Sequence, residues 1–181
     1  MIKTSINRLD DFIKNILNYS RNNRTEIFIE EIKILQIITS VVRSTENNKQ
    51  AKGIHFEVKN DIATNFHSDA LRFTTILENI ISNAVKYHNP AVRKRFIKIS
   101  VSCNDAELVL TIEDNGVGIA PEFHEKVFEM FFRLPGEAEG SGIGLYIVKE
   151  TVEKLHGNIQ ITSNLGQGTT LLIRLKNFKY D

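Results

Sequence analysis

The sequence has one cysteine, Cys103, among its 181 residues. A single cysteine excludes an internal disulfide bond and a metal cluster built on several cysteines, and it suits a reducing compartment. Because Cys103 stands in an alternating apolar run, we interpret it as a small buried hydrophobic residue and not as a reactive thiol. We therefore predict neither a disulfide framework nor a cysteine-bound metal.

Long apolar runs and blocks of like charge are missing as well. No apolar stretch approaches the roughly 18–20 residues that span a bilayer, and the first residues have no apolar core or cleavage site of a secretory signal. The net charge is +1, with no long basic block to hold nucleic-acid phosphates. We expect a cytoplasmic domain with a small molecule as its ligand and no direct membrane contact. A membrane anchor elsewhere in a longer protein is compatible with this expectation.

The length allows one packed domain with an appendage, since a typical domain has roughly 100–150 residues. We expect a helical segment over 1–22 and a globular domain over 25–178, because the polar residues 21–25 mark a boundary. The helical segment has apolar residues at steps of four and three, the a/d seam of a coiled coil or bundle, at Ile2, Ile6, Leu9, Ile13 and Ile16. This helix is expected to pair with another helix, for example in a second chain; packing onto its own domain is the alternative.

Hydrophobic periodicity predicts interleaved helices and strands in the globular domain. Helical spacing predicts helices over 30–47, 69–87 and 143–155. Alternation predicts strands over 27–29, 54–58, 96–103, 108–113, 159–162 and 169–175. The residues expected to cap or turn the chain are Ser68 or Asp69, Asn60-Asp61, Asn104-Asp105, Gly157 and Gly166. The predicted fold class is α+β, a two-layer sandwich with helices on one face of a mixed, mostly antiparallel sheet, preceded by an N-terminal helix.

Polar residues on the predicted helix over 69–87 form the first candidate site. Asn79, Asn83 and Lys86 are four and three residues apart and share one helix face, and Tyr87 follows them. Lys86 can neutralise phosphate charge, and an asparagine carbonyl is a hard oxygen ligand suited to Mg²⁺. Taken alone, the same pattern is also typical of a solvated helix face with a tyrosine packed beside it.

An aspartate followed by glycines forms the second candidate. Asp114 ends a predicted strand, and Gly116 and Gly118 allow a tight turn and a close approach of backbone to a flat ligand. An ionised aspartate here can accept a hydrogen bond from an adenine amino group, worth roughly 1.5–3 kcal/mol. A turn rich in Asp, Asn and Gly is equally typical of a plain connection.

Three glycines, Gly140, Gly142 and Gly144, come directly before a predicted helix, where backbone N–H groups and the helix dipole favour phosphate. The segment before them is not a strand, which excludes the dinucleotide fingerprint, and no Lys-Ser/Thr pair follows them, which excludes a Walker loop. The aromatic residues that precede this loop are typical of core or hinge positions; they are Phe128, Phe131 and Phe132.

In this order and at these separations, the clusters resemble the N, G1, F and G2 boxes of sensor histidine kinases, at residues 79–87, 113–119, 127–133 and 140–145. Residues 163–170 resemble the last glycine box of the family, so the resemblance covers roughly residues 25–177. It implies the Bergerat ATP-binding fold, which is shared with gyrase and related ATPases. Residues 9–21 resemble the end of the second helix of the dimerisation hairpin that precedes this domain in the family.

The resemblance implies how the matching residues bind Mg-ATP. Asn83 is expected to coordinate the Mg²⁺ ion that bridges the ATP phosphates, with Asn79 assisting, and Lys86 is expected to contact phosphate. Asp114 is expected to read the adenine amino group. The other residues expected to contact the nucleotide are Tyr87, Gly116, Gly118, Ile119, Phe131, Arg133, Gly140, Gly142, Gly144, Leu145 and Thr169. A short ATP lid is expected between the F and G2 boxes.

The resemblance also implies partners. The phosphoacceptor of the family is a histidine in a His-Glu-x-x-x-Pro type motif on the first hairpin helix, and none of the five histidines here has those neighbours. We therefore expect the acceptor on a preceding helix of the same or the partner subunit of a homodimer, with relay to an aspartate of a response regulator receiver domain. The 181 residues alone are not expected to phosphorylate themselves.

Two other functions stay open. Serine kinases and ATPases of the same fold carry a glutamate four residues before the magnesium asparagine, where this sequence has Asn79. Glu78 is turned by about 100° around the helix, so slow ATP hydrolysis is predicted. A non-catalytic nucleotide-binding or scaffold module would act only by pairing with a partner. The intact Asn83, Asp114 and glycine loops argue against that alternative.

Overall fold

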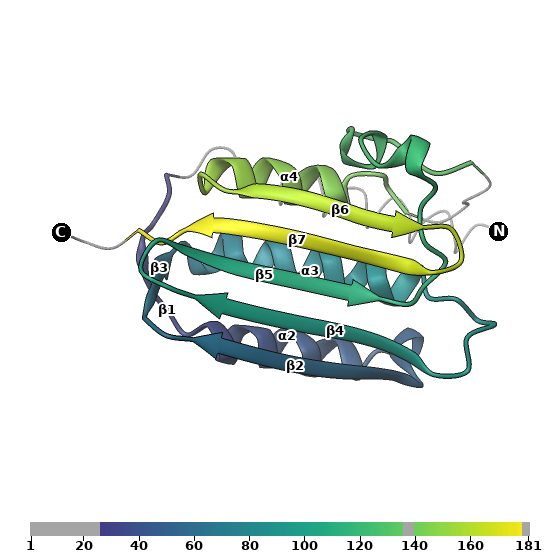
Figure 1. Ribbon diagram of the computed structural model, residues 1–181, viewed down its shortest axis with the longest axis horizontal. Coiled ribbons are helices and arrows are strands. Elements are labelled where there is room, and N and C mark those ends of the chain that lie inside the picture. The colour runs from purple at the N-terminus through teal and green to yellow at the C-terminus, as the bar shows by residue number, and fades with distance from the viewer. Residues whose placement is uncertain (1–25, 136–139, 179–181) are drawn as a thin grey trace, which may run out of the picture.

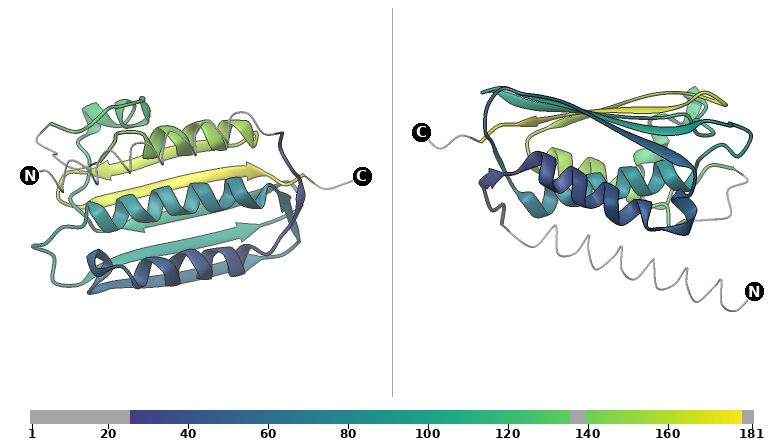
Figure 2. Two further views of the ribbon diagram at one scale, coloured as in Figure 1. Left: turned by 180° about the vertical axis from the view of Figure 1, so that it is seen from behind. Right: turned by 90° about the horizontal axis from the view of Figure 1, so that it is seen from below.

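The structure is a computed structural model, and it describes residues 26–135 and 140–178 (Figure 1). The helix predicted over 1–22 and the boundary predicted at 21–25 lie outside the described residues, as does most of the expected lid. The described part forms two layers, a five-stranded sheet and a layer of helices (Figure 2).

The main sheet is mixed and mostly antiparallel, as predicted. Its strand order is β2-β4-β5-β7-β6; β2 and β4 are parallel, and the other neighbours are antiparallel. The strands are β2 (Ile54–Ile62), β4 (Arg95–Cys103), β5 (Glu107–Asp114), β6 (Asn158–Asn164) and β7 (Gly168–Lys176). A separate two-stranded sheet pairs β1 (Glu30–Ile32) with β3 (Phe66–Ser68).

The long helices cover one face of the sheet (Figure 2), which confirms the predicted two-layer sandwich. They are α2 (Ile34–Glu46), α3 (Ala70–Lys86) and α4 (Gly144–Lys154), with 3₁₀ turns η1 (Lys49–Ala51), η2 (Pro121–Phe123) and η3 (Lys126–Phe128). Inward-facing residues of β4 are buried against these helices. Cys103 is one of them, which confirms the prediction that it is a buried residue. In the described ranges, no helix is long and apolar enough to cross a bilayer.

Local sequence explains where α3 and the β4–β5 hairpin begin and turn. Asp69 caps α3, because its Oδ1 accepts a hydrogen bond from the Arg72 N–H at 2.9 Å. Asp69 and Arg72 also form a buried ion pair, and Asp69 Oδ2 accepts from the Phe28 N–H. Asn104 Oδ1 accepts from the backbone N–H groups of Ala106 and Glu107 and so closes the hairpin turn.

Three local predictions were wrong. The first strand lies at Glu30–Ile32 and not at 27–29. Asn60 and Asp61 do not turn, since β2 continues to Ile62 while it pairs with β4, and this ladder outweighs their turn preference.

The third error concerns the end of α4. His156, and not Gly157, takes the left-handed conformation, with φ of 53°. A β-carbon on Gly157 would lie 2.3 Å from Arg174 O, so the glycine is needed there for a close approach to β7.

Candidate functional site

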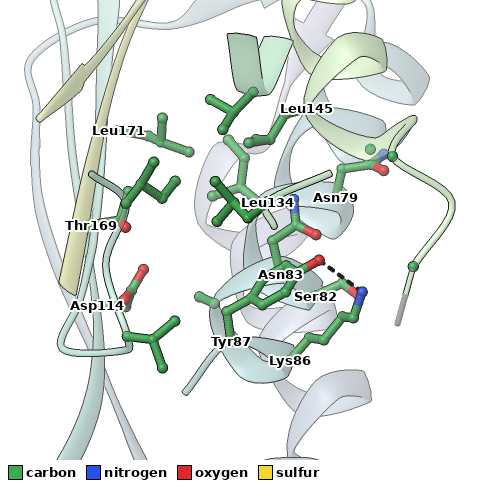
Figure 3. Close-up of a pocket in the computed structure, with 18 of the residues that line it drawn as sticks. Asn79, Ser82, Asn83, Lys86, Tyr87, Asp114, Leu134, Leu145, Thr169 and Leu171 are labelled. Carbon is green, nitrogen blue, oxygen red and sulfur yellow. Dashed lines mark hydrogen bonds between the residues drawn. The ribbon is translucent and has the colours of Figure 1, made fainter. Parts of the chain in front are cut away.

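A cavity of about 710 Å³ lies between α3 and the ends of β5 and β7. The loop after β5, residues 132–134 and the glycines before α4 complete its wall. Figure 3 shows Asp114 and Thr169 on the sheet side, and Asn79, Asn83 and Lys86 on the helix side. The cavity therefore brings together segments that are far apart in the sequence.

The Asn79 amide is oriented by its own helix, and the start of α4 lies close to the amides of both Asn79 and Asn83. Asn79 Nδ2 donates a hydrogen bond to Thr75 O at 2.8 Å, which leaves Asn79 Oδ1 as an acceptor toward the cavity. A β-carbon on Gly144 would lie 3.2 Å from Asn79 Oδ1 and 3.8 Å from Asn83 Oδ1. The N-terminus of α4 thus lies against both amide groups.

The ammonium group of Lys86 lies beside the glycine loop. Lys86 Nζ donates a hydrogen bond to Tyr87 Oη at 2.9 Å (Figure 3). A β-carbon on Gly140 would lie 2.2 Å from Lys86 Nζ, so any larger residue would displace the ammonium group. This end of the cavity therefore combines a cation with the backbone of a glycine loop and a helix N-terminus, which together favour an anion.

The opposite end of the cavity contains the Asp114 carboxylate. Its Oδ1 accepts a hydrogen bond from the Gly116 N–H at 2.8 Å, and the backbone N–H of Thr169 also donates to the carboxylate. Burial raises the pKa of the Asp114 carboxyl above its ordinary value, and these two backbone donors partly offset the rise. A buried carboxylate with acceptor capacity left suits a ligand that donates N–H groups.

The β6–β7 turn holds the loop that follows Asp114. The Gly166 N–H donates to Val117 O at 2.7 Å, and the Ile119 N–H donates to Ser163 Oγ at 2.8 Å. Gly118 has φ of 68°, and a β-carbon on it would lie 1.9 Å from Asn164 O. Two glycine-rich loops therefore pack backbone to backbone at this wall of the cavity.

All but two of the residues predicted for the site line this cavity. These are Asn79, Asn83, Lys86, Tyr87, Asp114, Gly118, Ile119, Arg133, Gly140, Gly142, Gly144, Leu145 and Thr169. The other two, Gly116 and Phe131, do not line it. A β-carbon on Gly116 would lie 2.4 Å from Tyr87 O, so Gly116 packs behind the wall. Phe131 is half exposed, has φ of 67° and donates its N–H to Gly142 O at 2.9 Å.

Several cavity residues were missed by the sequence analysis. Glu78 and Ser82 also line the cavity. Glu78 was predicted to face away from the row of Asn79, Asn83 and Lys86. It still reaches the cavity because the cavity extends around two sides of α3. Their spacing of four residues was a usable signal. Gln50 comes from η1 and had no signal in the sequence, because only the packing of η1 against α3 brings it to the cavity.

The side chains that could bind a metal in the cavity are compatible with Mg²⁺ that also binds water or phosphate oxygens. They are too few to hold a metal ion by themselves. Among the residues that the structure describes, no group of three or more His, Cys, Asp or Glu could hold a metal ion. The oriented Oδ1 of Asn79 and the neighbouring amide of Asn83 are hard oxygen donors. Mg²⁺ commonly keeps water and phosphate oxygens and takes few protein ligands, which fits this arrangement.

Known proteins resemble the chain in sequence and in fold. Its residues 68–178 match the family described as "Histidine kinase-, DNA gyrase B-, and HSP90-like ATPase". It is 30% identical over 175 residues to the methanogenesis regulatory histidine kinase FilI of Methanothrix harundinacea, covering 97% of this chain and 20% of FilI. It is 30% identical over 180 residues to the histidine protein kinase SaeS of Staphylococcus epidermidis, covering 95% of this chain and 49% of SaeS.

The structure of full-length ShkA in complex with AMPPNP has the same fold, with a TM-score of 0.78 at 22% identity, covering 94% of this chain and 36% of ShkA. The chain spans about half the length of SaeS and a fifth of FilI. Because the family match extends over more than half of its residues, the chain belongs to the histidine kinase-, DNA gyrase B- and HSP90-like ATPases, as an ATP-binding catalytic domain of the histidine kinase type.

Proposed function

We propose that this domain binds Mg-ATP in the cavity and positions the γ-phosphoryl group for transfer to a histidine on a dimerisation helix. The observation that carries the proposal is the chemical difference between the two ends of the cavity. One end presents the Asp114 carboxylate, and the other presents Lys86, amide groups and a glycine loop. A nucleotide has the matching polarity, with N–H donors on its base and negative charge on its phosphates.

At the base end, Asp114 reads the adenine amino group, as an acceptor held by the Gly116 and Thr169 backbone. Gly118 keeps the loop close to the β6–β7 turn, so that Ile119 and the loop backbone form one wall of the base site. Tyr87 and Leu145 also line the cavity and pack against the nucleotide. Burial of the carboxylate makes a missing hydrogen bond costly, which selects a ligand that supplies one.

At the phosphate end, Lys86 and Arg133 offset negative charge, and the backbone at Gly140, Gly142 and Gly144 approaches the phosphates. Lys86 needs only to leave the Tyr87 hydroxyl to reach them. These residues bind and orient the phosphates; no covalent chemistry by the protein is required.

Asn83 is the proposed Mg²⁺ ligand, and Asn79 assists with its oriented Oδ1. When bound, Mg²⁺ supplies charge neutralisation and orientation of the phosphate oxygens. Asn79 stands where a same-fold ATPase has its glutamate, and an amide cannot take a proton from water. We therefore propose that the domain hydrolyses ATP slowly by itself.

The partners follow from this reaction. The acceptor is a histidine on a helical hairpin of the same or the partner subunit of a homodimer, with residues 1–22 as part of that hairpin and 25–178 as the catalytic domain. The phosphoryl group then passes to an aspartate of a response regulator receiver domain. The relatives FilI and SaeS carry the name histidine kinase, which supports this assignment. We place the reaction in the cytoplasm, where ATP is available.

Titration with ATP and Mg²⁺, followed by calorimetry, tests the nucleotide site. We expect saturable binding that Asp114→Asn weakens about 10- to 100-fold, the size of a lost charge-assisted hydrogen bond. Glu113→Gln is the matched control, because this neighbouring carboxylate pairs with Lys98 at 3.5 Å and does not line the cavity. No saturable binding, or equal binding by Asp114→Asn, would refute the proposal.

A further inference from the structure

We propose that Ser163 is a positioning residue that makes the Thr169 hydroxyl a hydrogen-bond acceptor, so that the base end of the cavity selects an amino group and rejects a carbonyl oxygen. The inference rests on the proposed nucleotide function and deepens it. Ser163 does not line the cavity; it lies behind Thr169, on the neighbouring strand β6, and is 5% exposed.

Ser163 Oγ has three polar neighbours. It donates a hydrogen bond to Gly168 O at 2.7 Å, and it accepts one from the Ile119 N–H at 2.8 Å. Its third neighbour is Thr169 Oγ1 at 2.9 Å, where geometry alone permits either hydroxyl to donate. One buried hydroxyl thus connects the loop after β5, the β6–β7 turn and a side chain of the cavity.

Counting hydrogens decides the direction of the third bond. A serine hydroxyl has one hydrogen, and a carbonyl oxygen such as Gly168 O can only accept. The Ser163 hydrogen is therefore used at Gly168, and the Ile119 N–H can only donate. It follows that Thr169 donates its own hydroxyl hydrogen to Ser163. Toward the cavity, Thr169 Oγ1 then presents lone pairs alone.

Thr169 stands beside Asp114 on the sheet. The two residues are register partners in the antiparallel β5–β7 pair, and both side chains lie on the cavity side of the sheet (Figure 3). Directly opposite residues of such a pair have β-carbons about 4.5–5.5 Å apart. The base end therefore presents two neighbouring acceptors, the Asp114 carboxylate and the Thr169 oxygen, to one ligand group.

Two adjacent acceptors match an amino group, which has two N–H donors. A carbonyl oxygen in the same place would bring a third acceptor against them, with no hydrogen to share. A site rejects a ligand strongly when that ligand would leave buried polar groups of the site unpaired. Without the Ser163 acceptor, the Thr169 hydroxyl is free to rotate and donate to such an oxygen. Ser163 thereby sets a preference for 6-aminopurine over 6-oxopurine nucleotides without touching either.

The test compares ATP with inosine triphosphate, in which a carbonyl replaces the amino group. Dissociation constants for both are measured with the 181-residue chain and with Ser163→Ala. We expect Ser163→Ala to lower the ratio of the inosine triphosphate to the ATP dissociation constant about 5- to 10-fold, the size of one neutral hydrogen bond. Ser100→Ala, on an exposed position of β4 that does not line the cavity, is the matched control and should leave the ratio unchanged.

A purely structural role for Ser163 predicts a different result. In that case Ser163→Ala weakens both nucleotides by the same factor, and an unchanged ratio overturns the inference. If Ser163→Ala does not fold, Thr169→Val decides, since it keeps the side-chain shape and removes the acceptor. It should lower the ratio too, and an unchanged ratio again overturns the inference. Failure of the proposed function is distinct, because then the unmodified chain shows no Asp114-dependent ATP binding at all.

Discussion

Lys86 Nζ donates a hydrogen bond to Tyr87 Oη at 2.9 Å and lies 4.5 Å from the centroid of the Tyr87 ring. Neighbouring residues on a regular helix point in different directions, about 100° apart. Tyr87 is the C-cap of α3, and its backbone departs from helical geometry, with φ of −96° and ψ of 26°. This departure accompanies the contact between the two side chains. The ammonium group lies close to Gly140, where an added β-carbon would be 2.2 Å from Lys86 Nζ.

Lys86→Ala is expected to weaken ATP binding about 5- to 30-fold, because it removes a charge-assisted contact to phosphate. AMP binding should change less than 2-fold, since AMP lacks the β- and γ-phosphates that the ammonium group neutralises. Calorimetric titration with both nucleotides measures the two effects. Lys98→Ala on the outer face of the sheet is the control. Equal weakening of ATP and AMP would show that Lys86 does not contact phosphate.

The buried carboxyl of Asp114 makes nucleotide binding depend on pH. Burial raises its pKa, and the ionised form is the stronger, charge-assisted acceptor for the amino hydrogens. Binding is therefore strongest above the raised pKa and weakens as pH falls through it, at a higher pH than for an exposed aspartate. Dissociation constants measured from pH 4 to pH 8 check this. Asp114→Asn should flatten the profile, and the titration of the nucleotide itself cancels in the comparison of the two proteins.

The same raised pKa has an opposite consequence for the protein without nucleotide. The folded chain holds the Asp114 proton more tightly than the unfolded chain does, so the free energy of unfolding decreases as pH rises from the ordinary to the raised pKa. Above the raised pKa this contribution is constant. The free energy of unfolding in urea is measured at several pH values for the nucleotide-free unmodified chain and for Asp114→Asn. The difference between the two proteins isolates the contribution of Asp114. A contribution that grows with pH would contradict the assignment.

Gly118→Ala is expected to lower the free energy of unfolding by about 3–5 kcal/mol. The substitution combines a left-handed conformation, φ of 68°, with a β-carbon 1.9 Å from Asn164 O. Gly166→Ala is the matched control, because Gly166 also has positive φ, 80°, but nothing lies within 4 Å of its β-carbon. It should cost only about 1–2 kcal/mol. Urea midpoints measure both, and equal losses would exclude the steric contact as the cause.

The 181-residue chain should not label itself when incubated with radiolabelled ATP. None of its five histidines has the neighbours of the phosphoacceptor motif, and no histidine within the described ranges lines the cavity. A longer protein that includes the phosphoacceptor hairpin should acquire a phosphate that is labile in acid and stable in alkali. A label on the shorter chain alone that is labile in acid and stable in alkali would place the acceptor histidine within these residues.

Much of the fold was predictable, because it follows from short-range patterns. The Asp69 cap, the hairpin closed by Asn104 and the helical faces of α3 and α4 depend on residues within a few positions of each other. The errors arose where distant segments decide. Asn60 and Asp61 stay extended because β4 pairs with them, and Gly157 serves a close approach to Arg174 and not a helix end.

The candidate site divides in the same way. The sequence by itself determined the candidate residues and their order, since the amides, the aspartate and the glycines stand in recognisable clusters with helical or turn spacing. Only the tertiary structure decided that Gln50 reaches the cavity, that Phe131 does not line it, and that Ser163 Oγ lies 2.9 Å from Thr169 Oγ1. Such relations depend on the position of one hydrogen or one backbone oxygen across strands and loops, and no local pattern encodes them.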